Sequence, residues 1–319
     1  MEVELNWFLL FPLTIIVLLM IIPPLLWYFL HDIKHESSLL PPGPPRFPII
    51  GNLHQLNFAN LHGHLYQLSN KYGPLMSLRL GSLTVIVVSS AEFAKEAFST
   101  HDRELAGRPT FYGQMKISSN GLDIVFSPYG EYWRQMKKTV VHHLLSAKRV
   151  LSFRPIREDE VSRTMNIISQ FASQSKPINF SKITVYLVNS IICRTAFGKR
   201  YDDDEYTEDE TNSKFQYLVN ETQLVAGSFY MRDYFPYLGW VDKLVGRTRW
   251  VDKVCKDLYL FMQEIIDDHL HVERKKGDHD DEHQEADNHI VDLLLQLQEN
   301  HSLPLELTVD HIKSIIMVT

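Results

Sequence analysis

The chain of 319 residues contains only two cysteines, Cys193 and Cys255, and neither belongs to a Cys-x-x-Cys pair or to another cluster with metal-ligand spacing. Two isolated cysteines cannot build a disulfide framework, and they do not supply the ligand set of a structural zinc site. Each is most simply interpreted as a small structural residue within a helix. The scarcity of cysteine favours a reducing compartment for the body of the protein.

The chain also lacks the excess of basic residues that nucleic-acid-binding proteins carry, because its formal net charge is -7. Two acidic stretches account for this charge. Residues 202–210 hold seven acids and no base, and residues 273–289 hold seven acids and three bases. The distribution predicts two solvated acidic segments on a slightly basic body, and no nucleic-acid partner.

No charged residue occurs among the 26 residues from Leu5 to Leu30, which are rich in leucine, isoleucine, phenylalanine and tryptophan. This run is long enough to cross a bilayer as a tilted helix, even with a kink at Pro23-Pro24. Basic residues follow it at Lys34 and Arg46, so the positive-inside rule places the body in the cytosol. We expect residues 1–30 to form a single-pass transmembrane anchor.

A cleaved signal peptide is the alternative interpretation of this run. Such a peptide begins with basic residues, whereas this chain opens with Glu2 and Glu4. Three Asn-x-Ser/Thr triplets, at Asn179, Asn220 and Asn300, would be glycosylated only if the body lay in the secretory lumen. A cytosolic body leaves all three unmodified.

A proline-rich segment follows the anchor, with five prolines among the eight residues from Pro41 to Pro48. This composition predicts a stiff, extended spacer, or alternatively a ligand for a proline-binding domain. We expect the charged and proline-rich residues 31–50 to link the anchor to a body formed by residues 51–319.

The body is predicted to be mainly α with a small β-sheet. Leu75–Leu80 alternates in hydrophobicity, Gly81-Ser82 provides a turn, and Thr84–Val88 is a β-branched run, which together predict a hairpin. Ser89 and Glu92 predict a capping box for the helix that follows.

Most of the remaining chain is expected to be helical. Arg108–Asp123 has the glycine and serine content of a long loop. A helix beginning near Pro155 is expected to bury an apolar stripe composed of Val161, Met165, Ile168 and Phe171. Two further helices are expected over Ile183–Phe197, stopped by Gly198, and over Thr248–Lys276, the longest of the chain. The longest helix is expected to have an apolar face of seven residues at helical spacing: Val251, Val254, Leu258, Phe261, Met262, Ile265 and Ile266.

Residues 126–138 contain the strongest local pattern. Ser127 suits an N-cap and Pro128 suits the first helical position, so a helix is expected to begin there. Trp133 and Lys137 then lie on one face, where an indole N–H and an ammonium group could bind a carboxylate. The simpler interpretation is an aromatic ring packed against a lysine side chain.

The residues from Trp133 to Ile156 include six basic residues and no acidic one. Either a solvated helix face or a docking surface for an acidic partner explains this excess.

A metal hydrolase is another interpretation that the sequence invites. His279, Glu282 and His283 match the H-x-x-E-H pattern of inverted zinc proteases, with His289 as a third ligand. No large apolar residue occurs between Gly277 and His289, so this segment lacks a face to pack against a core and is better interpreted as a solvated linker.

Several of these segments together resemble the cytochrome P-450 superfamily of haem-thiolate monooxygenases, and in particular its large class of plant microsomal members. The resemblance covers the whole chain, and the ordered set of motifs is far more specific than any one of them. The segments that carry it are the anchor, the Pro-Pro-Gly-Pro-Pro spacer, Ile50-Gly51-Asn52, Tyr72-Gly73-Pro74-Leu75, Arg108-Pro109, Tyr129–Arg134 and Arg194–Gly198.

The resemblance implies haem b as a cofactor. In the family, a helix with a W-x-x-x-R pattern reaches over the haem edge, and its indole and guanidinium bind a haem propionate. The matching residues here are Trp133 and Lys137, so the cation is present but the bidentate fork of arginine is not.

The resemblance further implies a small apolar substrate, electrons from an NADPH-dependent reductase, and a place in the endoplasmic reticulum membrane with the body facing the cytosol. The basic residues expected to meet the reductase are Arg134, Lys138, Lys148 and Arg149. The residues expected to contact the substrate are Phe111, Met115, Phe229 and Tyr230.

The sequence departs from the family after Leu307–Met317. The oxygen-binding helix, the E-x-x-R pair and the F-x-x-G-x-R-x-C-x-G loop with the axial cysteine would follow this stretch, whereas the chain ends at Thr319. Cys193 and Cys255 lie in other motifs, so no metal ligand and no catalytic residue is expected. Residues 51–319 are therefore interpreted as a partial cytochrome P-450-like domain that lacks its C-terminal haem-thiolate region.

The expected function is that of the N-terminal portion of a monooxygenase, which oxidises a small apolar molecule with O₂ and reductase-supplied electrons. Electron donation by the thiolate favours O–O cleavage, so the chain as written is expected to be inactive alone. The alternative is a membrane-tethered, non-catalytic fragment or interaction protein. Membrane lipid around residues 5–30 is a partner in both interpretations.

Overall fold

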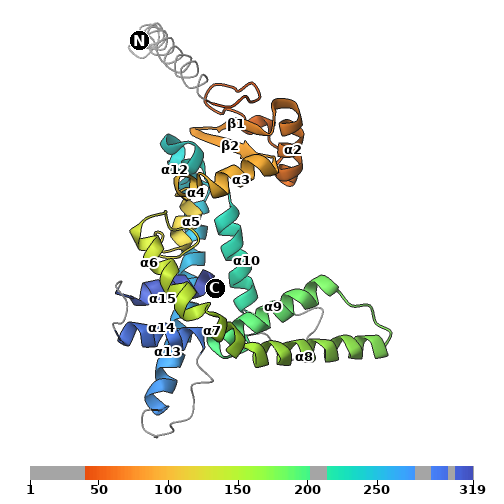
Figure 1. Cartoon of the computed structure of the whole chain (residues 1–319), viewed down its shortest axis with the longest axis vertical. Coiled ribbons are helices and arrows are strands. Elements are labelled where there is room, and N and C mark those ends of the chain that lie inside the picture. Colours follow the sequence, from red (N-terminus) through yellow and green to blue (C-terminus); the bar gives the residue numbers. More distant parts are fainter. Residues whose placement is uncertain (1–39, 202–213, 277–288, 301–305, 319) are drawn as a thin grey trace, which may run out of the picture. The chain divides into compact units, whose positions relative to one another are not determined.

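The computed structural model of the protein describes four ranges of residues: 40–201, 214–276, 289–300 and 306–318. Contacts divide the chain into two units. One unit ends at Leu105 and also includes the short segment Tyr234–Leu238. The other contains Ala106–Asp233 and the chain from Gly239 onward. Figure 1 labels the helices and strands of both units.

The first unit contains the predicted hairpin. Strands β1 (Leu75–Leu80) and β2 (Leu83–Val88) pair antiparallel, with Leu75 opposite Val88. Gly81 begins the turn at φ +63°, and a side chain there would meet the Tyr234 carbonyl oxygen at 2.4 Å. Glycine is therefore required at the turn for its backbone conformation and for the space that it leaves.

The proline-rich segment lies along this hairpin. The Ser77 N–H donates to the Pro42 carbonyl at 3.0 Å, and the Ser77 hydroxyl donates to the Pro41 carbonyl at 2.7 Å. The buried side chain of Asn52 donates to the Pro45 carbonyl at 3.2 Å. Proline lacks an N–H but keeps its carbonyl, so the segment can accept hydrogen bonds from β1 without forming a regular strand.

Helices complete the first unit: α2 (Leu61–Tyr72), α3 (Ala91–Ser99), α4 (Asp102–Leu105) and the 3-10 turns Leu53–Gln55, Phe58–Asn60 and Pro236–Leu238. The expected capping box from Ser89 to Glu92 is wrong by one residue. Ser90 caps α3, and its hydroxyl accepts the Phe93 N–H at 3.2 Å.

The second unit is built from helices. They are α5 (Tyr112–Ile117), α6 (Glu131–Thr139), the π-helical turn η3 (Val140–Leu144), α7 (Ala147–Ser152), α8 (Arg154–Ser173), α9 (Phe180–Phe197), α10 (Lys214–Gly227), α11 (Met231–Tyr234), α12 (Gly239–Leu244), α13 (Arg247–Lys276), α14 (Ile290–Glu299) and α15 (Val309–Val318). With the small sheet of the first unit, they confirm the prediction of a mainly α fold. The loop predicted over Arg108–Asp123 contains α5, which was not expected.

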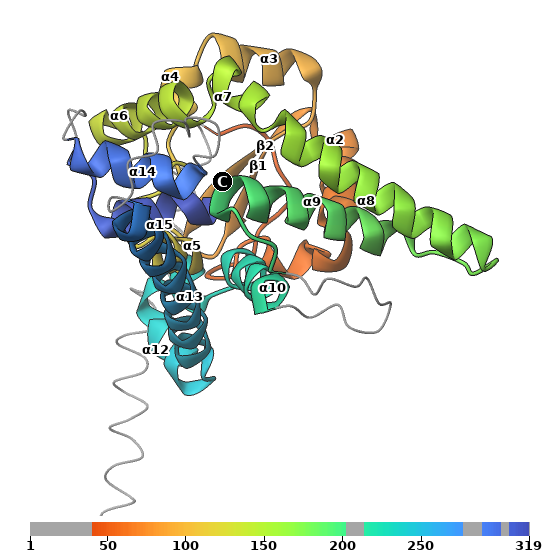
Figure 2. The same cartoon turned by 90° about the horizontal axis from the view of Figure 1, so that it is seen from below.

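The core of the second unit surrounds the longest helix, α13. Its predicted apolar face is confirmed, since all seven residues of it are buried: Val251, Val254, Leu258, Phe261, Met262, Ile265 and Ile266. Helices α14 and α15 lie beside α13 in both views (Figures 1 and 2), and α15 buries Ile312, Ile315 and Ile316. Burial of each such side chain contributes about 1.5–3 kcal/mol to folding.

Helix α8 differs from the expectation. Val161 and Met165 of the predicted apolar stripe are 45% and 55% exposed, whereas Glu160 is 1% exposed and Thr164 is also buried. In the first half of α8, the buried face is therefore displaced by one residue and is polar. In the second half, Ile168 and Phe171 of the predicted stripe are partly buried against Ile183 and Tyr186 of α9. Helix α8 thus packs on α9, which runs beside it (Figure 1).

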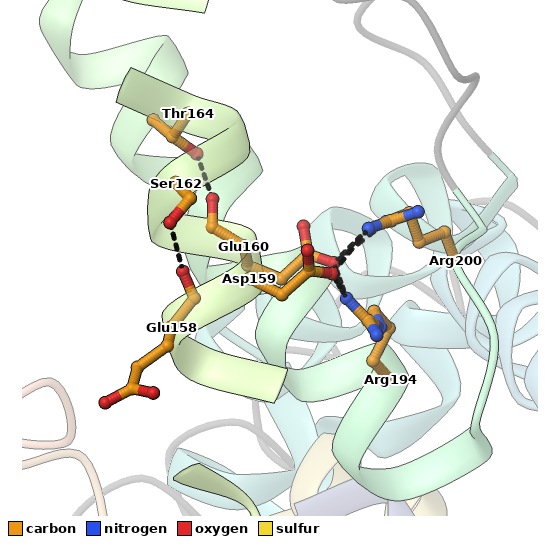
Figure 3. A network of polar contacts seen from close by, with 7 residues as sticks. All are labelled: Glu158, Asp159, Glu160, Ser162, Thr164, Arg194 and Arg200. Atoms are coloured by element: carbon orange, nitrogen blue, oxygen red, sulfur yellow. Dashed lines mark hydrogen bonds and ion pairs between the residues drawn. The ribbon is translucent and has the colours of Figure 1, made fainter. Parts of the chain in front are cut away.

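The buried face of α8 is held by ion pairs, as Figure 3 shows. Glu160 Oε1 accepts hydrogen bonds from Arg194 Nη1 at 2.6 Å and from Arg200 Nε at 2.8 Å. Asp159 pairs with the same two arginines, and the hydrogen bond from Arg194 lowers the pKa of its carboxyl. A carboxylate as buried as Glu160 is stable only when it is paired and hydrogen-bonded in this way.

Helices α9, α13 and α14 meet at a second polar contact. The two ring nitrogens of His269 face two acceptors: Nδ1 lies 2.5 Å from Asp292 Oδ1, and Nε2 lies 3.1 Å from the Phe197 carbonyl oxygen. Only the imidazolium form can donate to both. Asp292 Oδ2 also accepts the His289 N–H at 3.0 Å, which caps α14.

The membrane anchor predicted for residues 1–30 lies outside the described residues. None of the helices in the part of the chain that the structure describes is long and apolar enough to span a bilayer.

Replacement of Glu160 tests the polar face of α8. We expect Glu160→Gln to lower the free energy of unfolding by about 3 kcal/mol, because it breaks a buried ion pair from one side. Asp159→Asn is the matched control, and its exposed carboxylate is expected to contribute about 1 kcal/mol or less. Denaturant unfolding followed by circular dichroism measures both, and equal losses would contradict a network centred on Glu160.

The contact at Asp292 predicts a dependence on pH. Burial raises the pKa of this carboxyl, but the hydrogen bond and the charge of His269 outweigh burial and hold the pKa below its ordinary value. The contribution of Asp292 is therefore complete above the unfolded pKa of about 4 and is lost as pH falls through the lower, folded pKa.

We expect the stability difference between the wild type and Asp292→Asn to be constant between about pH 5 and pH 6 and to narrow below about pH 4. Urea unfolding between about pH 3 and pH 7 measures it. Asp267→Asn, which alters an exposed carboxylate of α13, serves as the control. A difference that stays constant down to the lowest pH would show that the carboxylate of Asp292 is not the responsible group.

Candidate functional site

The start of α6 is organised by a buried aspartate. Asp123 is fully buried, and its Oδ1 accepts the N–H groups of Val125 at 2.9 Å and Phe126 at 2.6 Å. Burial raises the pKa of its carboxyl, although these backbone hydrogen bonds act in the opposite direction. The expected start of the helix at Ser127 is wrong: α6 begins at Glu131, and no side chain caps it. Asp123 forms the turn that precedes the helix.

Two aromatic side chains of α6 hold the preceding loop. The Tyr132 hydroxyl donates to the Leu122 carbonyl at 2.6 Å, and burial raises the pKa of this phenol to about 12. The Trp133 indole Nε1–H donates to the Ile124 carbonyl at 2.9 Å. The indole N–H that the sequence predicted for an anion is thus bound to a backbone carbonyl of the same chain.

Lys137 lies on the face of the same indole. Its Nζ is 4.6 Å from the centroid of the Trp133 ring, and the side chain is exposed. The expectation that these residues share one helix face is therefore met. The geometry is a cation–π contact, worth about 0.5–1 kcal/mol at an exposed site. The ammonium group keeps its N–H donors accessible to an anion at this position.

These residues can be tested against the requirements of a haem. The ammonium group of Lys137 suits a propionate at the edge of the haem. The Trp133 indole N–H can donate to the same propionate only if it releases the Ile124 carbonyl. The two cysteines do not suit the axial position. Cys193 is buried inside α9, and burial raises the pKa of the Cys255 thiol to about 11, so it stays protonated. Within the described residues, no group of three or more His, Cys, Asp or Glu side chains is arranged to hold a metal ion.

The zinc site considered for His279 and His283 falls outside the described residues. His289, the third residue considered, begins α14, and its ring lies 6.3 Å from that of His269.

The basic residues after Trp133 differ in their contacts. Arg134 Nη2 pairs with Glu131 Oε2 at 2.5 Å, and hydrogen bonds from Gln135 and Arg134 lower the pKa of the Glu131 carboxyl. Lys138 and Lys148 are exposed, and Arg149 is half-buried. The positive charge of this surface thus rests mainly on α7 and on the end of α6.

Of the four residues expected to contact a substrate, Phe111 and Met115 lie at the start of α5 and within it, and Phe229 and Tyr230 follow the end of α10. Tyr230 is buried, and its hydroxyl donates to the Val225 carbonyl at 2.9 Å. Phe111, Met115 and Phe229 are half-buried. None of the four lines either of the two cavities described next.

The larger cavity, of about 270 Å³, lies among α9, α10, α13 and α15. Its wall is mostly apolar and includes Phe215, Leu218, Phe261 and Ile316. The Thr222 hydroxyl also lines it and has no hydrogen-bond partner among the described residues. The sequence indicated the apolar faces of the separate helices, but it did not indicate that they leave a space between them.

The smaller cavity, of about 120 Å³, lies among α5, α13 and α15. Its polar lining consists of Lys116, Ser119, Cys255, Tyr259, Lys313 and Ser314. Sequence analysis missed this cluster, because its members are far apart in the chain and match no motif.

Comparison with known proteins identifies relatives of the whole described body. The chain is 42% identical to strychnine-11-hydroxylase of Strychnos nux-vomica over 284 residues, which cover 88% of this chain and 53% of that protein. It is 40% identical to 6,7,8-trihydroxycoumarin synthase of Pastinaca sativa over 291 residues, which cover 91% of this chain and 54% of that protein.

A solved structure of a zebrafish cytochrome P450 with progesterone shares the fold. The TM-score is 0.56 at 20% sequence identity, and the match covers 81% of this chain and 55% of that chain. The family model for cytochrome P450 matches residues 41–319. The chain spans about half the length of the curated relatives it matches, and over that length it belongs to the cytochrome P450 family.

Proposed function

We propose that this chain forms the N-terminal part of a haem-thiolate monooxygenase, which inserts one oxygen atom from O₂ into a small apolar molecule. The family match over residues 41–319 is the observation that carries the proposal. The name of the Strychnos relative, a hydroxylase, agrees with oxygen insertion. The relatives are about twice as long, so the activity is proposed for a protein that also contains the regions this chain lacks.

The family implies haem b, which supplies oxygen activation when it is bound through a thiolate. In this chain, Lys137 is proposed to bind one haem propionate with its exposed ammonium group. Trp133 is proposed to position the Lys137 side chain over its indole ring. Its indole N–H is also proposed to donate to the propionate if the Ile124 carbonyl is released. The turn formed by Asp123 holds both residues in place by fixing the loop before α6.

The apolar cavity among α9, α10, α13 and α15 supports a small apolar substrate. Its volume of about 270 Å³ is near the lower end of the range for small-molecule sites. The Thr222 hydroxyl is placed to accept or donate one hydrogen bond that orients the molecule. Phe111, Met115, Phe229 and Tyr230 remain proposed contacts on the α5 side.

A reductase is proposed to dock on the exposed residues Lys138 and Lys148 and on the half-buried Arg149, with Arg134 at their edge. The family resemblance implies that a reductase supplies the electrons. We propose that residues 1–30 anchor the protein in the endoplasmic reticulum membrane, that residues 31–50 link the anchor to the body, and that residues 51–319 face the cytosol.

Haem binding tests the role of Lys137. We expect Lys137→Met to weaken haem binding by the 319-residue chain about fivefold at low salt, because one charged contact to a propionate is lost. Lys137→Arg is expected to bind haem at least as well as the wild type, since a guanidinium can bind the carboxylate with two hydrogen bonds. Absorbance titration with haem and quenching of tryptophan fluorescence measure the affinities.

Lys138→Met is the matched control for this titration, since it removes an exposed charge from the same helix. Equal affinities in all three variants would remove Lys137 from the site. A chain that binds no haem at all would favour a membrane-tethered protein without catalytic function.

Membrane topology tests the proposed anchor. Protease added to intact microsomes is expected to digest the body and to leave a protected fragment that contains residues 5–30. The three Asn-x-Ser/Thr triplets are expected to stay unmodified. A protected body that carries glycans would place it in the lumen and reverse the proposed orientation.

A further inference from the structure

The smaller cavity, among α5, α13 and α15, combines buried donors with a lack of buried acceptors. Its full lining consists of Lys116, Ile117, Ser119, Cys255, Leu258, Tyr259, Met262, Lys313, Ser314 and Met317. Two of these residues are lysines, and neither aspartate nor glutamate occurs in the lining. The cavity is therefore positive where most interior cavities are neutral.

Lys313 is the most unusual of these residues. It is only 5% exposed, and its Nζ has no hydrogen-bond partner among the described residues. The Nζ lies 3.2 Å from the centroid of the Tyr259 ring. A cation–π contact offsets part of the cost of burying an ammonium group, but it leaves N–H donors without acceptors. Buried charges are normally both paired and hydrogen-bonded.

Ser314, the next residue of α15, adds a second unsatisfied donor. It is 2% exposed, and its hydroxyl has no partner among the described residues. Native proteins leave few buried polar groups unpaired, so two adjacent ones lining one cavity indicate a ligand. The acceptor missing from both side chains is the same, an oxygen atom with negative charge.

The neighbouring groups do not provide that charge. The carboxylate of Asp252 is already paired, since its Oδ1 lies 3.0 Å from Lys116 Nζ. The Cys255 thiol stays neutral at physiological pH, because burial raises its pKa to about 11. Lys116 is thus paired with a carboxylate on one side of the cavity, whereas the Nζ of Lys313 on the other side has no hydrogen-bond partner among the described residues.

We propose that this cavity binds the carboxylate of a small organic acid, with Lys313 Nζ and Ser314 Oγ as the hydrogen-bond donors. Ile117, Leu258 and Met262 provide apolar contacts for the rest of the molecule. The cavity volume of about 120 Å³ is smaller than the volume of about 150 Å³ of an apolar cavity that holds benzene, so benzoate would place its carboxylate and part of its ring inside, with the rest of the ring at the open side of the cavity. This cavity is separate from the larger one proposed for the apolar substrate, so the inference goes beyond the proposed function and does not rest on it.

The test uses the 319-residue chain in detergent, without haem, and benzoate as the probe. Isothermal titration measures the affinity for benzoate and for benzyl alcohol, a neutral compound of similar size. We expect the wild type to bind benzoate more tightly than benzyl alcohol. We expect Lys313→Met to raise the Kd for benzoate at least about tenfold, while the Kd for benzyl alcohol changes less than about twofold.

Matched variants separate the charge at this position from general effects. Lys253→Met removes an exposed lysine of α13 and is expected to leave benzoate binding unchanged. Lys313→Arg keeps the charge and is expected to retain most of the affinity. Ser314→Ala removes the second donor and is expected to raise the Kd for benzoate about threefold to tenfold. This last variant also tests the proposal if Lys313→Met does not fold, which circular dichroism would show.

Two results would overturn the proposal. One is a wild type that does not prefer benzoate to benzyl alcohol, which would mean that the Tyr259 ring alone satisfies Lys313. The other is unchanged benzoate binding in both Lys313→Met and Ser314→Ala. Because haem is absent from these titrations, either failure leaves the haem titration of the Lys137 variants unaffected, and the reverse also holds.

Discussion

Burial of one face of α13 is the constraint on which the second unit depends. A helix of 30 residues is stable in water mainly because an apolar face packs against neighbours, and α13 packs against α10, α12, α14 and α15. The same face sets the positions of both cavities, since Leu258 and Met262 line the larger one and the smaller one. The positions of both cavities therefore follow from the same packing that stabilises the fold.

Polar contacts then determine how the other helices meet this core. Apolar burial is not directional, so it permits neighbouring helices to slide or rotate. Glu160 limits the α8–α9 pair to one register, because only that register brings its carboxylate to Arg194 and Arg200. His269 acts similarly where α9 ends, by linking the Phe197 carbonyl to Asp292. Each contact therefore fixes how the helices that it joins pack on one another.

The candidate site at α6 shows how backbone groups change the meaning of a motif. The spacing of Trp133 and Lys137 is a property of the helix, and it survives in the structure. The use of the indole N–H by the Ile124 carbonyl depends on the turn built by Asp123, which lies ten residues before Trp133. Local spacing thus indicated which side chains meet, but not which donor remains accessible to a ligand.

The sequence by itself determined the features that depend on periodicity and on local chemistry. The hairpin around Gly81, the end of α9 at Gly198 and the apolar face of α13 follow from patterns of a few neighbouring residues, and the ordered motifs indicated the family. Only the tertiary structure decided which face of α8 is buried, because Val161 and Met165 are as apolar as a core requires, whereas Glu160 finds two arginines from elsewhere in the chain. The tertiary structure likewise decided the surroundings of Lys313. Its ammonium group lacks an acceptor because of how α5, α13 and α15 pack together, and no local sequence pattern connects these three helices.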